Sequence, residues 1–123
     1  MDDLSEGSQQ TLEKNPLRVL DSKRREDQAI IADAPLMVDY LTDETAEHFA
    51  AVRAGLDALA IPYEISARLV RGLDYYTRTT FEFASTALEN AQNAVGGGGR
   101  YDGLAESLGG KSTPGIGLSL IHI

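Results

Sequence analysis

The chain has 123 residues, of which 42% are hydrophobic and 24% are charged, so its length and composition suit one folded domain. It contains no cysteine and only two histidines, which excludes disulfides and thiolate metal sites and argues against a zinc centre. Its formal net charge of −8 argues against a surface that binds nucleic acid through clustered basic residues.

The sequence shows no targeting or membrane segment. No apolar run approaches the ~18 residues that would suggest a bilayer span, and the acidic start Met1-Asp2-Asp3 is unlike a secretory signal. We therefore expect a cytoplasmic protein that makes no contact with a membrane.

Charge and glycine divide the chain in opposite directions. Residues 1–64 hold 14 acidic and 6 basic residues, whereas residues 65–123 hold five of each. Ten of the twelve glycines follow residue 65. Because the composition changes near Ile61-Pro62, we predict a boundary there between an acidic helical segment and a glycine-rich segment that contains strands.

The first segment has the signals of helices. Asn15 stands directly before Pro16, a pair typical of a helix start. The clearest helix is predicted from about Asp43 to Leu59, with Thr42 as its cap and acidic residues in its first turn. Apolar residues recur along it every three or four positions, at Ala46, Phe49, Val52, Leu56 and Leu59. No motif in this segment carries chemistry, and we interpret it as scaffold.

The second segment changes to the signals of strands. Loose alternation predicts one strand from Tyr63 to Val70, and β-branched and aromatic residues predict another from Thr79 to Phe83. A short amphipathic helix is expected from Leu104 to Leu108, ended by a left-handed cap at Gly109-Gly110. A further strand is predicted to enter at Thr113–Leu118.

Two clusters could bind a ligand, and the first contains Arg71, Asp74, Tyr75 and Tyr76. A guanidinium suits a carboxylate or phosphate held in two-point contact. On a strand the two tyrosines would point to opposite faces, so that one packs inward and the other presents its hydroxyl to a pocket. The alternative is a surface arginine paired with Asp74 beside two half-buried tyrosines.

The second cluster is Gly96–Gly99 followed by Arg100-Tyr101-Asp102. Its spacing matches neither the phosphate loop of nucleotide hydrolases nor the dinucleotide fingerprint. The glycines would let a strand pass close to a bound small molecule, with Arg100 and Tyr101 at its rim; the alternative is a flexible loop. The residues alone therefore indicate a glycine-lined pocket for a small anionic or zwitterionic ligand, and they name no reaction.

Several motifs together resemble one enzyme family. RLVRGLDYYTRT at 68–79 resembles the histidine-specific signature of histidyl-tRNA synthetases, and GGRYDGL at 98–104 resembles the second signature of that family. TPGIG at 113–117 is similar to the start of the third class II motif, and NPLRVLD at 15–21 is similar to the helical insertion of the family. The resemblance covers residues 13–118.

The resemblance implies an α+β fold: a class II aminoacyl-tRNA synthetase core with an antiparallel sheet and flanking helices, preceded by part of a helical insertion. It implies activation of histidine by ATP, with Mg²⁺ accompanying the ATP, and transfer of histidine to tRNA(His) by a homodimeric parent enzyme. It makes Arg71 the catalytic residue and a histidine ligand, and it places Tyr75, Tyr76 and Tyr101 in the histidine pocket. Gly98 and Gly99 would supply pocket backbone, and no metal ligand of the chain itself is implied.

The sequence also departs from the family. The first two class II motifs are absent, the third stops before its arginine, and residues 118–123 do not continue the pattern, so that His122 is given no role. We therefore expect a helical insertion segment over 1–62, a partial catalytic core over 63–117 and a tail over 118–123 that is foreign to the family. The expectation is an internal fragment of the enzyme that is inactive alone.

Two other interpretations stay open at this point. The regulatory subunit of ATP phosphoribosyltransferase is a non-catalytic paralogue of the synthetases, and it resembles the chain in the Tyr-Tyr-Thr and glycine-rich segments. It tends to lack the run Arg71-Gly72-Leu73-Asp74, which is intact here. A small stand-alone binding module is the third possibility and depends on length alone.

Overall fold

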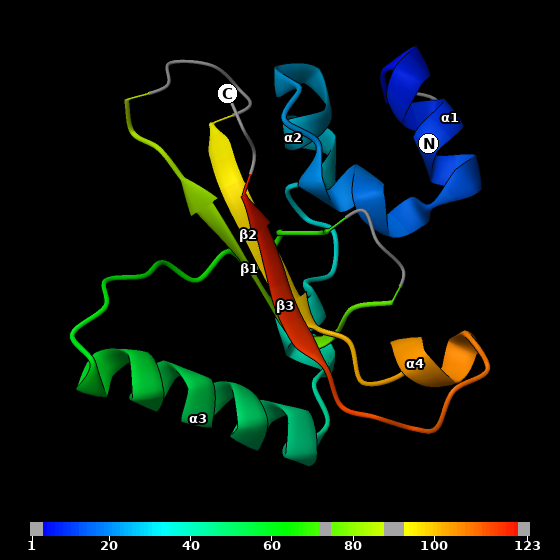
Figure 1. Ribbon diagram of the computed structural model, residues 1–123. Coiled ribbons are helices and arrows are strands. Elements are labelled where there is room, and N and C mark those ends of the chain that lie inside the picture. Colours follow the sequence, from blue (N-terminus) through cyan, green and yellow to red (C-terminus); the bar gives the residue numbers. More distant parts are fainter. Residues whose placement is uncertain (1–3, 72–74, 88–92, 121–123) are drawn as a thin grey trace. The chain divides into compact units, whose positions relative to one another are not determined.

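The computed structural model describes residues 4–71, 75–87 and 93–120, which belong to two compact units, Met1–Gly72 and Leu73–Ile123 (Figure 1). The described part of the first unit is helical, and that of the second is a three-stranded antiparallel sheet with one short helix. This confirms the predicted α+β class. The division between the units lies further along the chain than the composition change near residue 62.

The first unit has a small core around its N-terminal helices. Leu4, Val19 and Ile31 are its buried apolar side chains, and Leu12 and Ala34 pack against them. α1 and η1 contact each other closely. The described elements of this unit are, in order, α1 (Glu6–Lys14), η1 (Pro16–Asp21), α2 (Arg25–Ile31), η2 (Met37–Tyr40) and α3 (Asp43–Ala58), where η marks a 3-10 helix.

A fully buried carboxylate joins three of these elements. Asp27 in α2 accepts hydrogen bonds from the backbone N–H of Ser5 at 2.9 Å and from the hydroxyls of Ser8 and Ser22 at 2.6 and 2.8 Å. Ser5 precedes α1, Ser8 lies within it, and Ser22 follows η1. These hydrogen bonds, that from Ser8 foremost, stabilise the charged form and lower the pKa of Asp27 to about 2, although burial opposes the shift.

The predicted helix over 43–59 is confirmed as α3. The hydroxyl oxygen of Thr42 accepts a hydrogen bond from the backbone N–H of Thr45 at 3.3 Å, so the predicted cap is in place. Phe49, Val52 and Leu56 on its apolar stripe are half-buried. Ala46 and Leu59, which the sequence placed on the same stripe, are exposed. The periodicity therefore identified the helix and only the middle part of its less exposed side.

The predicted capping of a helix by Asn15 is wrong. The residues from Pro16 onward form the 3-10 helix η1, and the Asn15 side chain makes no capping hydrogen bond. Asn15 instead ends α1, where its backbone N–H donates to the carbonyl of Thr11 at 2.8 Å. The proline does occupy a first helical position, which agrees with its fixed φ angle.

The predicted strand over 63–70 is also wrong. These residues are extended or turning chain, with a turn in which the Leu69 N–H donates to the Ser66 carbonyl at 3.2 Å. A strand needs a neighbour that takes up its backbone hydrogen bonds, and these residues pair with none of the described strands. The alternation of apolar and polar side chains was therefore not enough to predict a strand.

The second unit is built on β1 (Thr77–Ala84), β2 (Ala94–Arg100) and β3 (Ile116–Leu120), in the spatial order β1-β2-β3. The predicted strand over 79–83 is confirmed within β1. The four glycines Gly96–Gly99 form the middle of the central strand and are buried, so they are not a flexible loop. β3 runs across the predicted boundary between residues 117 and 118.

The predicted short helix is confirmed as α4 (Leu104–Ser107), which follows β2. Gly109 adopts a φ of +87°, in the left-handed region that favours glycine. The left-handed stop that the sequence indicated after this helix is therefore present.

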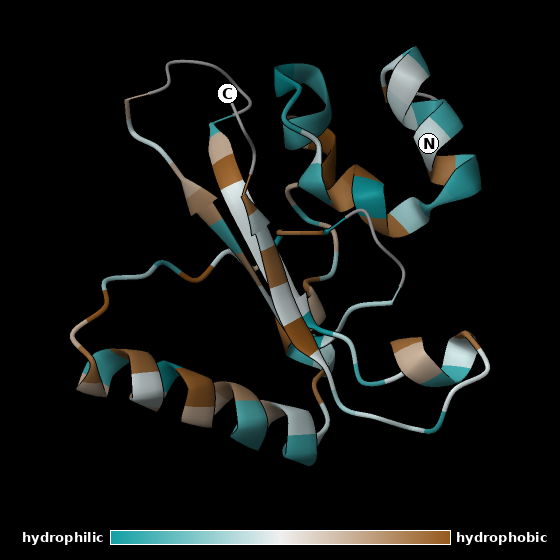
Figure 2. Ribbon diagram, viewed as in Figure 1, coloured by the Kyte–Doolittle hydropathy of each residue, from teal (hydrophilic) through white to brown (hydrophobic). Residues whose placement is uncertain are grey.

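The two faces of the sheet differ. Strand pairing sets Phe81 beside Gly98 and Gly98 beside Leu118, and side chains of directly paired residues lie on the same face. Figure 2 shows hydrophobic and paler residues alternating along β3. We call one side of the sheet the apolar face; its large side chains, 37 to 76% exposed, are Phe81, Phe83, Ile116, Leu118 and Leu120.

Candidate functional site

Three tyrosine rings gather in the second unit. The ring centroid of Tyr75 lies 5.1 Å from that of Tyr76 and 5.7 Å from that of Tyr101. Tyr75 and Tyr101 meet edge to face at 85°, an arrangement that the charge distribution of aromatic rings favours. The structure thus brings together the three tyrosines that the sequence predicted for one pocket, and all three are half-buried.

The predicted arrangement of Tyr75 and Tyr76 is nevertheless wrong in one respect. They were expected on a strand, with side chains on opposite faces. β1 begins only at Thr77, so strict alternation does not apply to them, and their rings contact each other. Both rings therefore contribute to the same cluster.

The tyrosine rings lie against three glycines. A side chain at any of these glycine positions would collide with a tyrosine side chain. A Cβ at Gly99 would lie 2.7 Å from Cδ1 of Tyr76, and one at Gly115 would lie 2.6 Å from Cε2 of Tyr101. A Cβ at Gly117 would collide with the hydroxyl of Tyr101. We call this side of the sheet the tyrosine face; it comprises Tyr75, Tyr76, Tyr101, Gly99, Gly115 and Gly117.

The glycines therefore make room for tyrosine rings, whereas the sequence suggested that they make room for a bound molecule. Gly99 serves the tyrosine face in this way. Gly98 does not, because a Cβ there would meet Leu118 and the carbonyl of Gly117 on the other side. Gly115 and Gly117 were missed as site residues, although they are the two glycines of the TPGIG motif.

Arg100 and Asp102 flank Tyr101 and bind each other. Nε of Arg100 lies 2.8 Å from Oδ2 of Asp102, and each side chain is 31% exposed. This hydrogen bond is the main reason why the pKa of Asp102 lies below its usual value. Arg100 was expected at the rim of a bound molecule, but its Nε binds Asp102, two residues further along the chain.

Arg71 belongs to a different unit from the tyrosine cluster. It is the last described residue of the first unit and is half-buried, whereas the tyrosines belong to the second unit. Asp74, the partner considered for it, lies outside the described residues. The shared pocket of Arg71 and the tyrosines accordingly stays a prediction.

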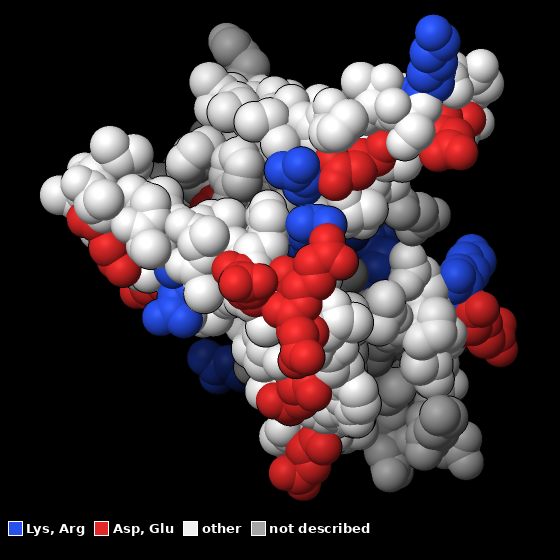
Figure 3. Space-filling view, turned by 90° about the horizontal axis from the view of Figure 1, so that it is seen from below, with Lys and Arg blue, Asp and Glu red and all other residues white. Residues whose placement is uncertain are grey.

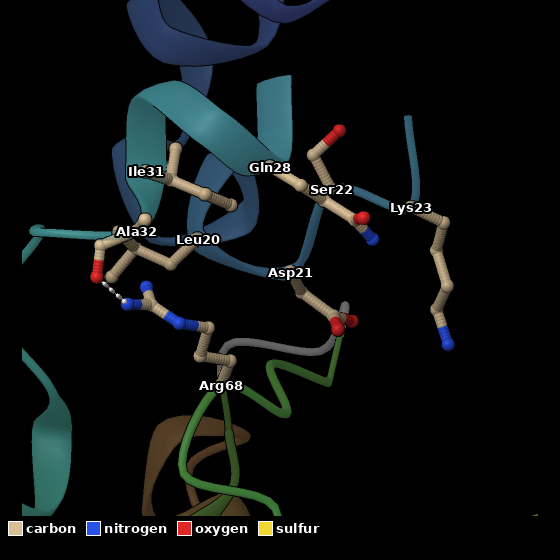
Figure 4. Close-up of a pocket in the computed structure, with 8 residues that line it drawn as sticks. All are labelled: Leu20, Asp21, Ser22, Lys23, Gln28, Ile31, Ala32 and Arg68. Carbon is tan, nitrogen blue, oxygen red and sulfur yellow. Dashed lines mark hydrogen bonds between the residues drawn. The ribbon is translucent and has the colours of Figure 1, made fainter. Parts of the chain in front are cut away.

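The first unit has a pocket of its own, with a volume of about 520 Å³ (Figure 4). Nη2 of Arg68 crosses it to donate to the carbonyl of Ala32 at 2.7 Å. Its lining mixes apolar side chains such as Leu20 and Ile31 with charged ones such as Asp21 and Lys23. None of the site residues predicted from the sequence lines it.

Charge and metal-binding groups limit what the described residues can bind. Figure 3 shows Asp and Glu side chains gathered on the face it presents, with Lys and Arg more dispersed. Among the described residues, no group of three or more His, Asp or Glu side chains could hold a metal ion. No helix in the described part of the chain is long and apolar enough to cross a membrane.

Comparison with known proteins links these features to a family. A family model described as histidyl-tRNA synthetase matches residues 3–122. The histidine–tRNA ligase of Mycolicibacterium vanbaalenii is 55% identical over 118 residues, which are 96% of this chain. That of Mycobacterium leprae is 55% identical over the same length.

A crystal structure of apo S. aureus histidyl-tRNA synthetase is also similar, with a TM-score of 0.63 and 38% sequence identity over 97% of this chain. The match covers 28% of the S. aureus chain. Likewise, this chain spans 27 to 28% of the length of the ligases that it matches in M. vanbaalenii and M. leprae.

Proposed function

The chain belongs to the histidyl-tRNA synthetase family, and from that premise we propose that it forms part of the catalytic domain of a histidine–tRNA ligase. The proposed reaction is activation of histidine by ATP to histidyl-adenylate, followed by transfer of histidine to tRNA(His). The observation that carries the proposal is the convergence of Tyr75, Tyr76 and Tyr101 on one face of the sheet. The chain would contribute to this activity and, because it spans 28% of such a ligase, would not perform it alone.

The tyrosine face offers the chemistry that histidine recognition needs. A phenol hydroxyl both donates and accepts hydrogen bonds, and a neutral imidazole presents one nitrogen of each kind. A site that pairs both ring nitrogens rejects amino acids that lack them, because its own polar groups would stay unsatisfied. We assign this pairing to the tyrosine hydroxyls, while the glycines hold the rings close to the sheet.

We assign Arg71 to the activation step on the strength of its place in the RGLDYY motif. Its guanidinium would bind the substrate carboxylate and the α-phosphate, where negative charge develops during adenylate formation. In a synthetase-length enzyme, Arg71→Ala should lower the rate of adenylate formation by about 10²–10³-fold with little loss of fold. An unchanged rate would remove Arg71 from this role.

The remaining partners follow from the family and are part of the proposal. Mg²⁺ would arrive bound to the phosphates of ATP. The parent enzyme would be a cytoplasmic homodimer.

The named relatives are all histidine–tRNA ligases, which supports this proposal over a regulatory subunit of ATP phosphoribosyltransferase. A regulatory subunit would bind histidine but would catalyse no exchange. Measurement of exchange therefore separates the two functions.

The test is a hybrid ligase in which this chain replaces the matching segment of the M. vanbaalenii enzyme. We expect histidine-dependent exchange of pyrophosphate into ATP, at a rate within about tenfold of the parent enzyme. The same hybrid with Arg71→Ala serves as the negative control. A hybrid that folds yet exchanges no pyrophosphate would contradict the proposed function, and robust exchange by the 123-residue chain alone would contradict its partial nature.

A further inference from the structure

Arg100, the last residue of β2, and the two residues that follow it point alternately to the two sides of the sheet. Arg100 pairs with Ile116 and therefore projects from the side of the apolar face. The ring of Tyr101 lies on the other side, against Gly115 and Gly117. Asp102 returns to the side of Arg100, where the two side chains meet at 2.8 Å. An ion pair between positions i and i+2 thus encloses the backbone of the tyrosine between them.

Two further hydrogen bonds fix this segment to its neighbours. The backbone N–H of Tyr101 donates to the carbonyl of Gly115 at 2.8 Å, which ties it to the residue before β3. The backbone N–H of Asp102 lies 3.4 Å from the hydroxyl oxygen of Thr77, the first residue of β1. The backbone on both sides of the Tyr101 side chain is therefore held to strands β1 and β3.

We propose that the Arg100–Asp102 pair is a clamp that sets the position of the Tyr101 hydroxyl above Gly117. Arg100 and Asp102 are then positioning residues for histidine binding. The proposal depends on the proposed function, because it assigns this role within the histidine pocket. The clamp touches no substrate; it acts through the backbone of Tyr101. The Tyr75 ring, whose centroid lies 5.7 Å from that of Tyr101, also limits where the Tyr101 ring can move.

Because the Arg100–Asp102 pair is partly exposed, we expect it to position Tyr101 rather than to stabilise the fold. Both side chains are 31% exposed, and ion pairs that water reaches contribute little to the free energy of unfolding. The same pair restricts the torsion angles of the one residue between its members. Loss of the pair should therefore change ligand affinity more than stability, which a merely structural ion pair would not do.

The test is Asp102→Asn in the hybrid ligase. We expect the KM for histidine to rise about tenfold, while kcat and the KM for ATP stay within about twofold. Glu106→Gln is the matched control, because it removes the same charge from an exposed position in α4, and it should change none of these values. Asp102→Glu restores the carboxylate and should recover most of the affinity for histidine.

A double-mutant cycle with Tyr101→Phe decides whether the clamp acts through the hydroxyl. If it does, Asp102→Asn has no further effect once the hydroxyl is absent. An equal effect of Asp102→Asn in both backgrounds would overturn the proposal. So would a result in which Tyr101→Phe raises the KM for histidine and Asp102→Asn leaves it unchanged. A Tyr101→Phe variant with unchanged affinity would instead contradict the place of Tyr101 in the proposed histidine pocket. If Asp102→Asn fails to fold, Arg100→Lys takes its place in the cycle with the same expected signs.

Discussion

Each unit of the molecule contains a carboxylate whose pKa is lowered, and the two are built in opposite ways. Asp27 is fully buried and accepts hydrogen bonds from residues of three different segments. Asp102 is partly exposed and binds Arg100, two residues away on the same strand end. The first carboxylate therefore determines how helices assemble, whereas the second determines where a single side chain points. A lowered pKa alone does not reveal which of these roles a carboxylate has.

The largest effect should come from removing the buried carboxylate. Asp27→Ala leaves the Ser8 and Ser22 hydroxyls and the Ser5 N–H without their acceptor inside the helical unit. We expect the melting temperature, followed by circular dichroism at 222 nm, to fall by about 5–10 °C. The exposed residue Asp33 provides the control, and Asp33→Ala should melt within about 2 °C of the unchanged chain. Equal melting of both variants would remove the distinction between the two carboxylates.

The next effect tests how closely Tyr101 lies against the sheet. Gly117→Ala introduces a Cβ where the tyrosine hydroxyl lies, and such overpacking costs about 1–3 kcal/mol. In the hybrid ligase we expect the KM for histidine to rise about tenfold or more. At Gly103 a Cβ meets nothing within 4 Å, so Gly103→Ala is the matched control. Similar kinetics for the two variants would show that the ring tolerates displacement.

A smaller effect is expected when a hydroxyl is lost but its ring is kept. Tyr76→Phe should leave the packing against Gly99 intact and weaken the preference for histidine over phenylalanine by about tenfold. The ratio of kcat/KM for the two amino acids in pyrophosphate exchange measures this preference. Unchanged discrimination would assign recognition of the imidazole to other groups.

The smallest expected effect is a change in the slope of acid unfolding, and it tests the lowered pKa of Asp27. Its pKa is about 2 in the folded chain against an ordinary 3.8, so its charged form stabilises the fold above about pH 4. That stability is lost as the pH falls from about 4 to 2. Helical signal measured across this window should decline in the unchanged chain and show a shallower dependence on pH in Asp27→Ala. The same slope in both would assign the acid transition to other carboxylates.

The sequence predicted best where the signal was local. The cap of α3 depends on Thr42 and the next three residues, and the stop after α4 depends on one glycine in a left-handed conformation. Both are visible in the sequence because neighbouring residues alone determine them. The strand expected at 63–70 failed because a strand also needs a partner, which its own residues do not specify.

The candidate site was predictable in its residue types and not in its arrangement. The three tyrosines were identified from their motifs, yet the sequence could not show that Gly99 lies under one of their rings and Gly98 on the other side of the sheet. That difference depends on the register of β2 with β3, which pairs Gly99 with Gly117. The Arg100–Asp102 pair was missed although its spacing of two residues at a strand end places both side chains on one side.

The apolar face has a consequence for anyone who produces this chain. On β3, an outer strand of the described sheet, Ile116, Leu118 and Leu120 are 59 to 76% exposed. An uncovered edge strand with large aliphatic side chains can pair with the edge strand of another molecule, and repeated pairing forms aggregates. Bacterial expression of residues 1–123 alone should therefore yield part of the product as inclusion bodies, and Leu118→Lys should raise the soluble fraction.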